Sequence, residues 1–268
     1  MKPQLPPSRI KLAFFRWFSY LLLFPLGILA TSFFGCISLT CSLWDKSGRQ
    51  QHAIAQVWAR TVLRIALSPV QIIGTENLRR CPVAVYTCNH LSYMDTPVLF
   101  GNLPFQFRIL ARHDLWKIPF IGWHLNRSGQ VPVDASSLRS SVASLNRGVA
   151  ALKSGMPLLV FPDGTRASDG QIHEFLGGSA WMAIRAGVPI VPIALVGTYE
   201  LMPIHVYHLT PRPLMMVVGE PIETAGCSTK DADTITRRVF DSITAMYYRY
   251  SEVQRDPEPA VPLHRSLD

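Results

Sequence analysis

The sequence VAVYTCNHLSYMDTP occupies residues 83–97 and decides the fold class of the chain. Its apolar first half is typical of a buried β-strand, which runs into a polar turn at Asn89 and His90. Asp95 and Pro97 then indicate the start of a helix, because acidic residues and proline are favoured in a first helical turn. A strand, a polar turn and a helix in this order are typical of an α/β domain, in which sites lie at the carboxyl ends of strands.

Strand and helix signals alternate along the rest of the chain. Short apolar runs bounded by turn residues predict further strands at residues 107–110, 158–161, 190–196 and 215–218. Apolar residues at helical spacing predict helices at residues 52–68, 137–153, 180–186 and 231–250. We therefore predict an α/β fold with a mixed, largely buried sheet flanked by helices. The prolines within residues 187–197 favour an edge or irregular strand there.

The composition indicates a globular domain tied to a bilayer. The chain has 268 residues, of which 48% are hydrophobic and 16% charged, and this hydrophobic fraction excludes a disordered chain. The net charge of +8 indicates an anionic partner, and nucleic acid, an anionic lipid surface and a phosphorylated substrate all fit. The apolar N-terminal segment favours lipid, so we expect a membrane partner and no nucleic acid. The five cysteines include no Cys-x-x-Cys pair, so no metal site is expected.

Residues 17–44 contain no charged side chain. At about 1.5 Å per residue, a helix of that length exceeds the ~30 Å hydrocarbon core of a bilayer. Because Pro25, Gly27 and Gly35 interrupt the run, it predicts either a single kinked span or a re-entrant helical hairpin. A cleaved signal peptide and a buried pair of core helices would also account for the run. Basic residues flank the run on both sides, which suits a hairpin with both flanks on the cytoplasmic face.

We expect three parts in the chain: a membrane anchor at residues 1–50, a catalytic domain at 51–252 and a flexible tail at 253–268. The helix predicted at residues 52–68 has two interpretations, a helix packed in the core or one that lies on the membrane.

His90 and Asp95 are the candidate catalytic residues. Asp95, at the start of a helix, can fold back across one turn towards His90. A carboxylate on one imidazole nitrogen fixes the tautomer and leaves the other nitrogen free to take a proton from a substrate hydroxyl. Ser92 and Cys88 are rival nucleophiles for a hydrolase, although no Gly-x-Ser-x-Gly elbow occurs in the chain.

A second polar turn follows the apolar run at residues 158–161. Arg166 offers a planar fork for a phosphate, and Gly164 and Thr165 can add close backbone approach and donors. Asp163 is expected to orient Arg166 or to cap the turn. Further along the chain, residues 191–193, which are Val191, Pro192 and Ile193, form either plain sheet core or the wall of a substrate tunnel.

Taken together, these stretches resemble the glycerolipid acyltransferase family, and within it the 1-acyl-sn-glycerol-3-phosphate acyltransferases. The family block Asn-His-x-x-x-x-Asp is matched by Asn89, His90 and Asp95. The block Phe-Pro-Glu-Gly-Thr-Arg is matched at residues 161–166, with Asp163 in place of Glu. A second block is matched at residues 112–134 and a Val-Pro-Ile block at residues 191–193.

The resemblance implies a membrane-bound O-acyltransferase that needs no metal and no cofactor. It would move a fatty acyl group from acyl-CoA or acyl carrier protein to a lysophospholipid hydroxyl, first of all that of 1-acylglycerol-3-phosphate, giving phosphatidic acid. His90 would be the general base, and Asp95 would orient it. Arg166, with Asp163, Gly164 and Thr165, would hold the acceptor phosphate, and residues 191–193 would shape the acyl or acceptor site. The catalytic domain is expected on the cytoplasmic face of the inner or cell membrane.

The chain departs from the family pattern at three places. Asp163 is one methylene shorter than the family Glu, and Ala135 and Leu176 stand where family members commonly carry cations. A head group that needs fewer cations, such as that of a lyso-ornithine lipid, is therefore a second candidate acceptor. A lipid esterase and a non-catalytic protein that binds anionic lipid are the remaining candidate functions.

Overall fold

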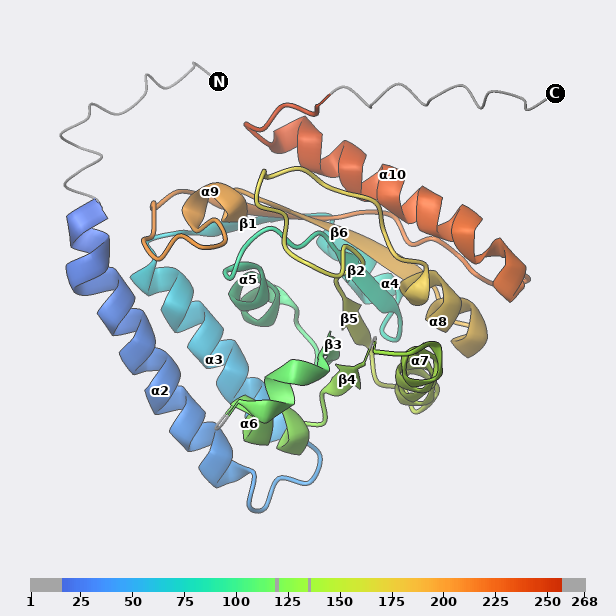
Figure 1. Ribbon diagram of the computed structural model, residues 1–268, viewed down its shortest axis with the longest axis horizontal. Coiled ribbons are helices and arrows are strands. Elements are labelled where there is room, and N and C mark those ends of the chain that lie inside the picture. Colours follow the sequence, from blue (N-terminus) through green and yellow to red (C-terminus); the bar gives the residue numbers. More distant parts are fainter. Residues whose placement is uncertain (1–15, 119–120, 135, 257–268) are drawn as a thin grey trace.

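A seven-stranded mixed sheet forms the centre of the molecule in the computed structural model, which describes residues 16–118, 121–134 and 136–256 (Figure 1). The strand order is β1-β7-β6-β2-β5-β3-β4, and β6 with β7 is the antiparallel pair while the other neighbours are parallel. The strands are β1 (Val70–Ile73), β2 (Val85–Cys88), β3 (Arg108–Arg112), β4 (Val131–Val133), β5 (Leu158–Val160), β6 (Ile190–Val196) and β7 (Leu214–Val218). The predicted mixed α/β fold is therefore confirmed.

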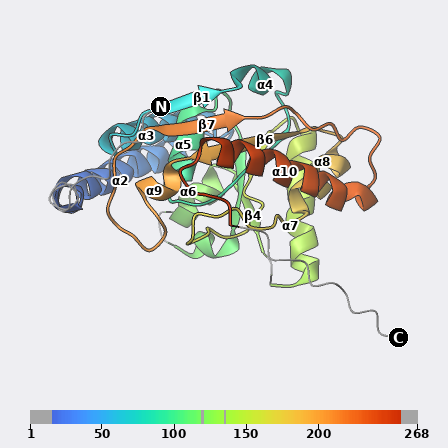
Figure 2. The same cartoon turned by 90° about the horizontal axis from the view of Figure 1, so that it is seen from above.

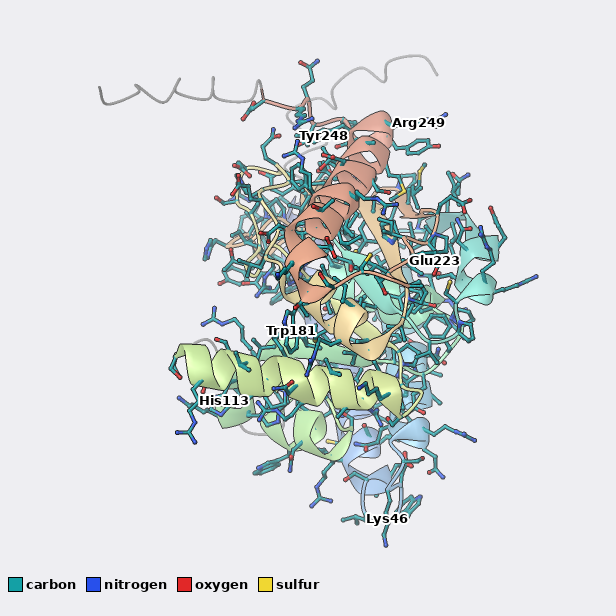
Figure 3. All side chains as sticks on the ribbon, turned by 90° about the vertical axis from the view of Figure 1, so that its right-hand side faces the viewer. Lys46, His113, Trp181, Glu223, Tyr248 and Arg249 are labelled. Carbon is teal, nitrogen blue, oxygen red and sulfur yellow. The ribbon has the colours of Figure 1, made fainter. Side chains whose placement is uncertain are left out.

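Helices cover both faces of this sheet, and each face has its own apolar core. The helices are α2 (Phe24–Cys41), α3 (Arg49–Ile65), α4 (Thr75–Arg80), α5 (Asp95–Asn102), α6 (Ile121–Arg127), α7 (Leu138–Lys153), α8 (Gly178–Ala186), α9 (Thr198–Leu201) and α10 (Ala232–Tyr250). Residues of α3 and α5 pack with Tyr86 and Val191 on one face. Residues of α7, α8 and α10 pack with Val85 and Ile190 on the other, as Figure 3 shows around Trp181 on α8.

The position of β6 corrects one prediction. Its prolines favoured an edge or irregular strand, but β6 lies between β7 and β2 and all its residues are buried. Pro192 is tolerated there because it lies opposite Gly219, just beyond the last residue of β7, and accepts a hydrogen bond from Gly219 N at 2.8 Å. Proline has no N–H to donate, but at Pro192 none is needed for the ladder with β7, because that ladder ends at Val218, one residue before Gly219.

The apolar N-terminal run forms one continuous helix from Arg16 to Cys41. Of the two expected shapes, a single kinked span and a re-entrant hairpin, the run therefore has the single helix of the first. Its first part, Ser19–Leu23, is a π-helical turn. Pro25 explains this turn, because its ring has no N–H to donate and would clash with the carbonyl of Leu21 in an ordinary α-helix. Residues 1–15 of the expected anchor and residues 257–268 of the expected tail lie outside the described residues.

The helix Arg16–Cys41 is long and apolar enough to cross a membrane. Its most apolar 18-residue stretch has a mean hydropathy of 2.0, and 11% of that stretch is buried. The most exposed apolar side chains on it are those of Trp17, Leu21, Leu29 and Phe33, each more than 60% exposed. Such an exposure does not fit a buried pair of core helices. It leaves one long apolar face of α2 outside the protein core.

The other face of α2 lies along α3, and the two run side by side at one end of the molecule (Figures 1 and 2). Hydrogen bonds tie α2 to the rest of the protein at both ends. Near its start, Leu209 N donates to Ser19 Oγ at 2.6 Å, and near its end Ser38 Oγ lies 3.0 Å from His124 Nδ1. Because α3 also packs against α5, it is a core helix, the first of its two interpretations.

Candidate active site

The turn after β2 is fixed to the neighbouring strand β6. Asn89 is fully buried, and its side chain makes two hydrogen bonds with the backbone of Leu195, which are Nδ2 to the carbonyl oxygen at 3.0 Å and Leu195 N to Oδ1 at 2.8 Å. These bonds continue the β2–β6 ladder one residue beyond Cys88 through a side chain. His90 therefore leaves the carboxyl end of the sheet from a rigid base.

Asp95 is the first residue of α5 and its carboxylate is fully buried. Its Oδ2 accepts from Leu91 N at 2.7 Å, from Ser92 N at 2.8 Å and from His90 Nδ1 at 2.8 Å. The predicted contact between Asp95 and His90 is thus present. Because the carboxylate accepts at Nδ1, that nitrogen carries the hydrogen and Nε2 is the free basic nitrogen. The His90 side chain is 17% exposed, whereas that of Asp95 is fully buried.

Phe161 fixes the plane of the imidazole from one side. The rings of His90 and Phe161 stack with centroids 3.9 Å apart and an interplanar angle of 18°. Phe161 follows directly after β5, which pairs with β2, so the sheet itself brings the two rings together. The sequence placed Phe161 in a motif but gave it no role.

Asp163 contacts the catalytic turn rather than Arg166. Its Oδ2 accepts from His90 N at 3.0 Å, and its Oδ1 is buried without a hydrogen-bond partner among the described residues. Burial is the largest cause that raises the pKa of the Asp163 carboxyl, and the nearby Asp95 charge also raises it; hydrogen bonds from the amides of His90 and of Asp163 itself lower it, and the net result is a rise from the ordinary value of 3.8 to about 7. The expectation that Asp163 orients Arg166 is wrong.

The raised pKa of Asp163 predicts a stability that falls with pH. Between about pH 4 and pH 7 the folded protein keeps a proton that the unfolded chain has released, so the free energy of unfolding falls by about 2–4 kcal/mol over that window. Asp163→Asn keeps an acceptor for the His90 amide and removes the buried charge. We expect it to raise Tm by about 5 °C at pH 8 and to leave Tm unchanged at pH 4, in thermal unfolding followed by circular dichroism.

The matched control is Asp169→Asn, which changes an exposed carboxylate that pairs with His173. It should shift Tm little at either pH, since exposed ion pairs contribute little. Equal destabilisation by Asp163→Asn at both values of pH would contradict a buried carboxylate that holds its proton.

The turn that follows Asp163 carries the expected phosphate-binding residues. Gly164 has φ of +69°, and a Cβ there would lie 3.1 Å from the Leu176 side chain, which accounts for glycine at this position. Thr165 is exposed. The Arg166 guanidinium lies over the ring of Tyr93, with Cζ 4.2 Å from the centroid, and has no hydrogen bond or ion pair within the described part of the chain.

The third expected group of site residues lies elsewhere. Val191, Pro192 and Ile193 are buried within β6, and Val191 and Ile193 belong to the apolar core that α3 and α5 cover. They are sheet core, and any influence on substrate passes through the packing of β2 and its turn. The structure thus brings together His90, Asp95 and Asp163. Residues 191–193 are buried in the sheet and do not join this group.

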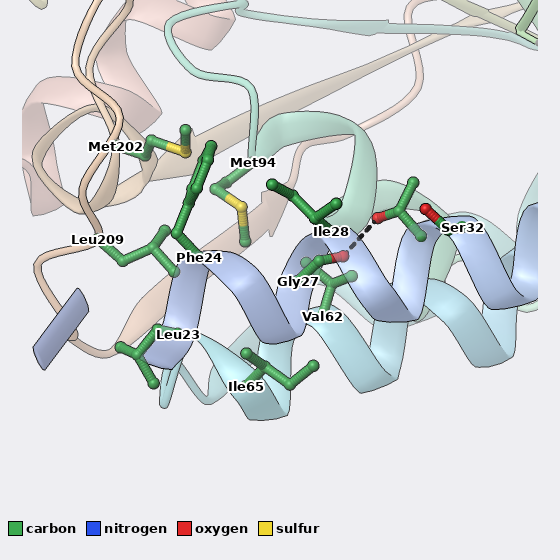
Figure 4. A pocket seen from close by; sticks show the side chains of 11 residues that line it. Leu23, Phe24, Gly27, Ile28, Ser32, Val62, Ile65, Met94, Met202 and Leu209 are labelled. Atoms are coloured by element: carbon green, nitrogen blue, oxygen red, sulfur yellow. Dashed lines mark hydrogen bonds between the residues drawn. The ribbon is translucent and has the colours of Figure 1, made fainter. Parts of the chain in front are cut away.

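An apolar groove of about 260 Å³ opens beside the catalytic segment (Figure 4). Side chains from α2, α3 and two loops line it: Leu23, Phe24, Gly27, Ile28, Thr31, Ser32, Val62, Ile65, Met94, Met202 and Leu209. Met94 immediately precedes Asp95 in the chain, and the Met202 carbonyl accepts from Ser92 Oγ at 2.7 Å. The groove is therefore tied to the segment that carries His90 and Asp95.

The two rival nucleophiles are not placed for catalysis. Ser92 is fully buried and its hydroxyl donates to the Met202 carbonyl. Cys88 is fully buried in β2, and burial raises the pKa of its thiol well above the ordinary value, so the thiol stays protonated. These contacts speak against a lipid esterase. Among the residues that the structure describes, no group of three His, Cys, Asp or Glu side chains is placed to hold a metal ion.

Comparison with known proteins gives consistent similarities. A protein-family model described as Acyltransferase matches residues 69–196, from β1 to the end of β6. The structure is similar to the crystal structure of the 1-acyl-sn-glycerophosphate (LPA) acyltransferase PlsC from Thermotoga maritima. The TM-score is 0.66 at 26% sequence identity, over 82% of this chain and 92% of that one.

Curated relatives carry similar names. The chloroplastic 1-acyl-sn-glycerol-3-phosphate acyltransferase LPAT1 of Arabidopsis thaliana is 36% identical over 60% of this chain and 45% of its own length. A Chlamydomonas reinhardtii 1-acyl-sn-glycerol-3-phosphate acyltransferase is 36% identical over 71% and 56%. The Saccharomyces cerevisiae 1-acyl-sn-glycerol-3-phosphate acyltransferase is 28% identical over 83% and 76%. The chain spans about half the length of the plant and algal relatives.

Proposed function

Because this chain belongs to the acyltransferase family, we propose that it transfers a fatty acyl group from a thioester to the hydroxyl of a lysophospholipid. The acceptor is 1-acylglycerol-3-phosphate and the product phosphatidic acid, in line with the names of the relatives. The donor is acyl-CoA or acyl carrier protein. The observation that carries this proposal is the buried Asp95 carboxylate on His90 Nδ1, which leaves Nε2 as a free base at the edge of the sheet.

His90 acts as the general base on the acceptor. Its Nε2 takes the proton of the acceptor hydroxyl while the oxygen attacks the thioester carbonyl. When the tetrahedral intermediate collapses, the carbon–sulfur bond breaks and the departing sulfur takes the proton back from the imidazolium, which yields an ester and a free thiol. Asp95 stabilises the imidazolium through the 2.8 Å contact at Nδ1, and no covalent acyl-enzyme is needed.

Arg166 holds the phosphate of the acceptor. Its guanidinium makes no hydrogen bond or ion pair within the described residues, so the donors of its planar fork are open to a phosphate. The exposed backbone of Gly164 and Thr165 lies in the same turn. The apolar groove beside Met94 takes an acyl chain, since its lining is almost entirely hydrocarbon.

The exposed face of α2 attaches the protein to a bilayer. Because α2 packs along α3 and is hydrogen-bonded to the catalytic domain at both ends, it presents one apolar face to lipid and keeps the other on the protein. We therefore favour a helix that lies in one leaflet over one that crosses the bilayer. The lysolipid acceptor and the diacyl product reside in the same leaflet, on the cytoplasmic side where acyl thioesters are available.

One observation favours a second acceptor class. Leu176 lies against the position of Gly164, 65% exposed, where the family pattern has a cation, so Arg166 faces the acceptor with less basic support than is usual. A lyso-ornithine lipid, which has no phosphate, needs fewer cations. The choice between the two acceptors is a matter of head-group charge and leaves the role of His90 unchanged.

Free-thiol release by detergent-purified protein tests the proposal. We expect long-chain acyl-CoA with lysophosphatidate to release thiol at a rate that depends on both substrates. Thiol release with a lyso-ornithine lipid but not with lysophosphatidate would identify the lyso-ornithine lipid as the acceptor. Thiol release with acyl carrier protein but not with acyl-CoA would identify the carrier protein as the donor. Release of free fatty acid without any acceptor, or no release with either donor and any lysolipid, would overturn the proposed transfer.

A further inference from the structure

Two contacts join the catalytic turn to the phosphate-binding turn. The Asp163 carboxylate accepts from the amide of His90, and the Arg166 guanidinium lies over the ring of Tyr93. The residues within each turn are three apart, so the two contacts form parallel ties between the segments 90–93 and 163–166. The first tie involves backbone, whereas the second is made by side chains alone.

Tyr93 is held firmly in place by its neighbours. On its N-terminal side, the amides of Leu91 and Ser92 both donate to Asp95. Ser92 Oγ donates to the Met202 carbonyl and accepts from Met94 N at 3.1 Å, which fixes the backbone on both sides of Tyr93. Tyr93 is 39% exposed, and its ring, three residues after His90 on this fixed backbone, forms the shelf on which Arg166 rests.

Stacking on such a shelf orients a guanidinium without occupying its donors. A cation over an aromatic face is attracted to the ring through the face of the guanidinium plane, and the N–H groups at its edge stay available for a bidentate anion. The Arg166 donors have no protein partner within the described residues, and the guanidinium is half-buried over the ring. The long arginine side chain therefore loses much of its rotamer freedom before a ligand arrives.

We propose that Tyr93 is a specificity-determining residue, which positions Arg166 so that the enzyme prefers acceptors that carry a phosphate. This inference rests on the proposed function and deepens it. Because Tyr93 and His90 belong to one rigid segment, a guanidinium held on Tyr93 keeps a set position relative to His90, so a phosphate bound in the fork places the acceptor hydroxyl at a fixed distance from the base. A lysolipid without phosphate does not bind the Arg166 fork, so the contact between Tyr93 and Arg166 does not raise its affinity.

Four variants and two acceptors test this inference. Tyr93→Leu removes the ring, Tyr93→Phe keeps it, Arg166→Ala removes the cation, and the double variant removes both. Tyr250→Leu is the matched control, because it removes another arginine–tyrosine stack, that with Arg249 at the end of α10, where Cζ lies 5.5 Å from the ring centroid. Lysophosphatidate and its phosphate-free counterpart 1-acylglycerol are compared by steady-state kinetics and by calorimetric binding in detergent.

We expect Tyr93→Leu to raise KM and Kd for lysophosphatidate about fivefold, as the loss of a cation–π contact implies, and to leave those for 1-acylglycerol and the acyl donor unchanged. Tyr93→Phe and Tyr250→Leu should match the wild type. In the Arg166→Ala background, Tyr93→Leu should add no further loss. A fivefold effect that persists without Arg166, or that is equal for both acceptors, would overturn the role of Tyr93.

The binding arm separates this inference from the proposed function. A protein that binds lysophosphatidate through Arg166 and Tyr93 but releases no thiol would refute acyl transfer and uphold the positioning role. A protein that transfers acyl groups but binds both acceptors equally, with or without the Tyr93 ring, would uphold acyl transfer and refute the positioning role of Tyr93. Failure to bind lysophosphatidate at all would overturn both.

Discussion

Replacement of His90 by alanine is expected to lower kcat for acyl transfer by about 10²–10⁴, the range that general base catalysis contributes. His90 Nε2 is the only ring nitrogen of this residue open to a substrate, because Nδ1 is engaged by Asp95 at 2.8 Å. KM for the acceptor should change little, since the sites that we propose for the phosphate and the acyl chain, Arg166 and the groove, do not include His90. Thiol release from acyl-CoA, measured with saturating lysophosphatidate, gives the ratio of the two rates.

The His90 variant should fold normally, because the imidazole is partly exposed and Asp95 keeps its bonds to Leu91 and Ser92. Far-ultraviolet circular dichroism checks this. Asp95→Asn is the companion change, which should also lower kcat, since a neutral amide no longer stabilises the imidazolium that forms during the reaction. If kcat of His90→Ala for acyl transfer lies within tenfold of the wild-type value, His90 is not the general base.

The double substitution Leu29→Lys and Phe33→Lys is expected to abolish binding to lipid vesicles. Both side chains are more than 60% exposed on the free face of α2. A lysine in the hydrocarbon region costs about 2.5–3.5 kcal/mol, so each substitution should weaken vesicle partitioning by about 60- to 300-fold. Sedimentation with vesicles of a neutral and an anionic lipid, followed by activity on vesicle-borne lysophosphatidate, measures both consequences.

Activity on lysophosphatidate below its micellar concentration is the internal control, because the catalytic centre is untouched and the rate should stay within about twofold. Val142→Lys provides the matched control, since Val142 is 41% exposed on α7, away from α2. Full sedimentation of the double variant with vesicles would show that the exposed face of α2 does not enter lipid.

The sequence was sufficient for those features that depend on short-range order. Asp95 lies five residues after His90 at the start of a helix, so the contact between them follows from local geometry. The strand at residues 190–196 and the helix at 137–153 were likewise predicted nearly to their ends, because long apolar patterns have a clear period. β1 and β4 were missed, since β4 has three residues with Pro132 at its centre and β1 has only four.

Contacts across the sheet could not be read from the sequence. Asp163 is 73 residues from His90, and the bond between them depends on β5 lying next to β2, a strand order that hydrophobic patterns do not encode. The stack of Phe161 on His90 and that of Arg166 on Tyr93 have the same origin. The prediction of an edge strand from Pro192 was wrong for a related reason. The free-energy cost of a proline in a sheet depends on where the neighbouring strand ends, here β7, and the sequence of β6 does not show this.

The base and the group that orients it come from one segment, residues 90–95, whose geometry Asp95 secures through three bonds to a single oxygen. The proposed contacts for head group and acyl chain reach this segment at Tyr93 and Met94, and the rest of them come from other parts of the chain, such as Arg166 and the other groove residues. In evolutionary terms, the proposed base and the group that orients it form one short unit of sequence, while Arg166, Leu176 and most of the groove lining lie outside that unit. Substitutions at Arg166, Leu176 or the groove residues outside positions 90–95 are therefore expected to change the preferred lipid while the contact between His90 and Asp95 stays intact.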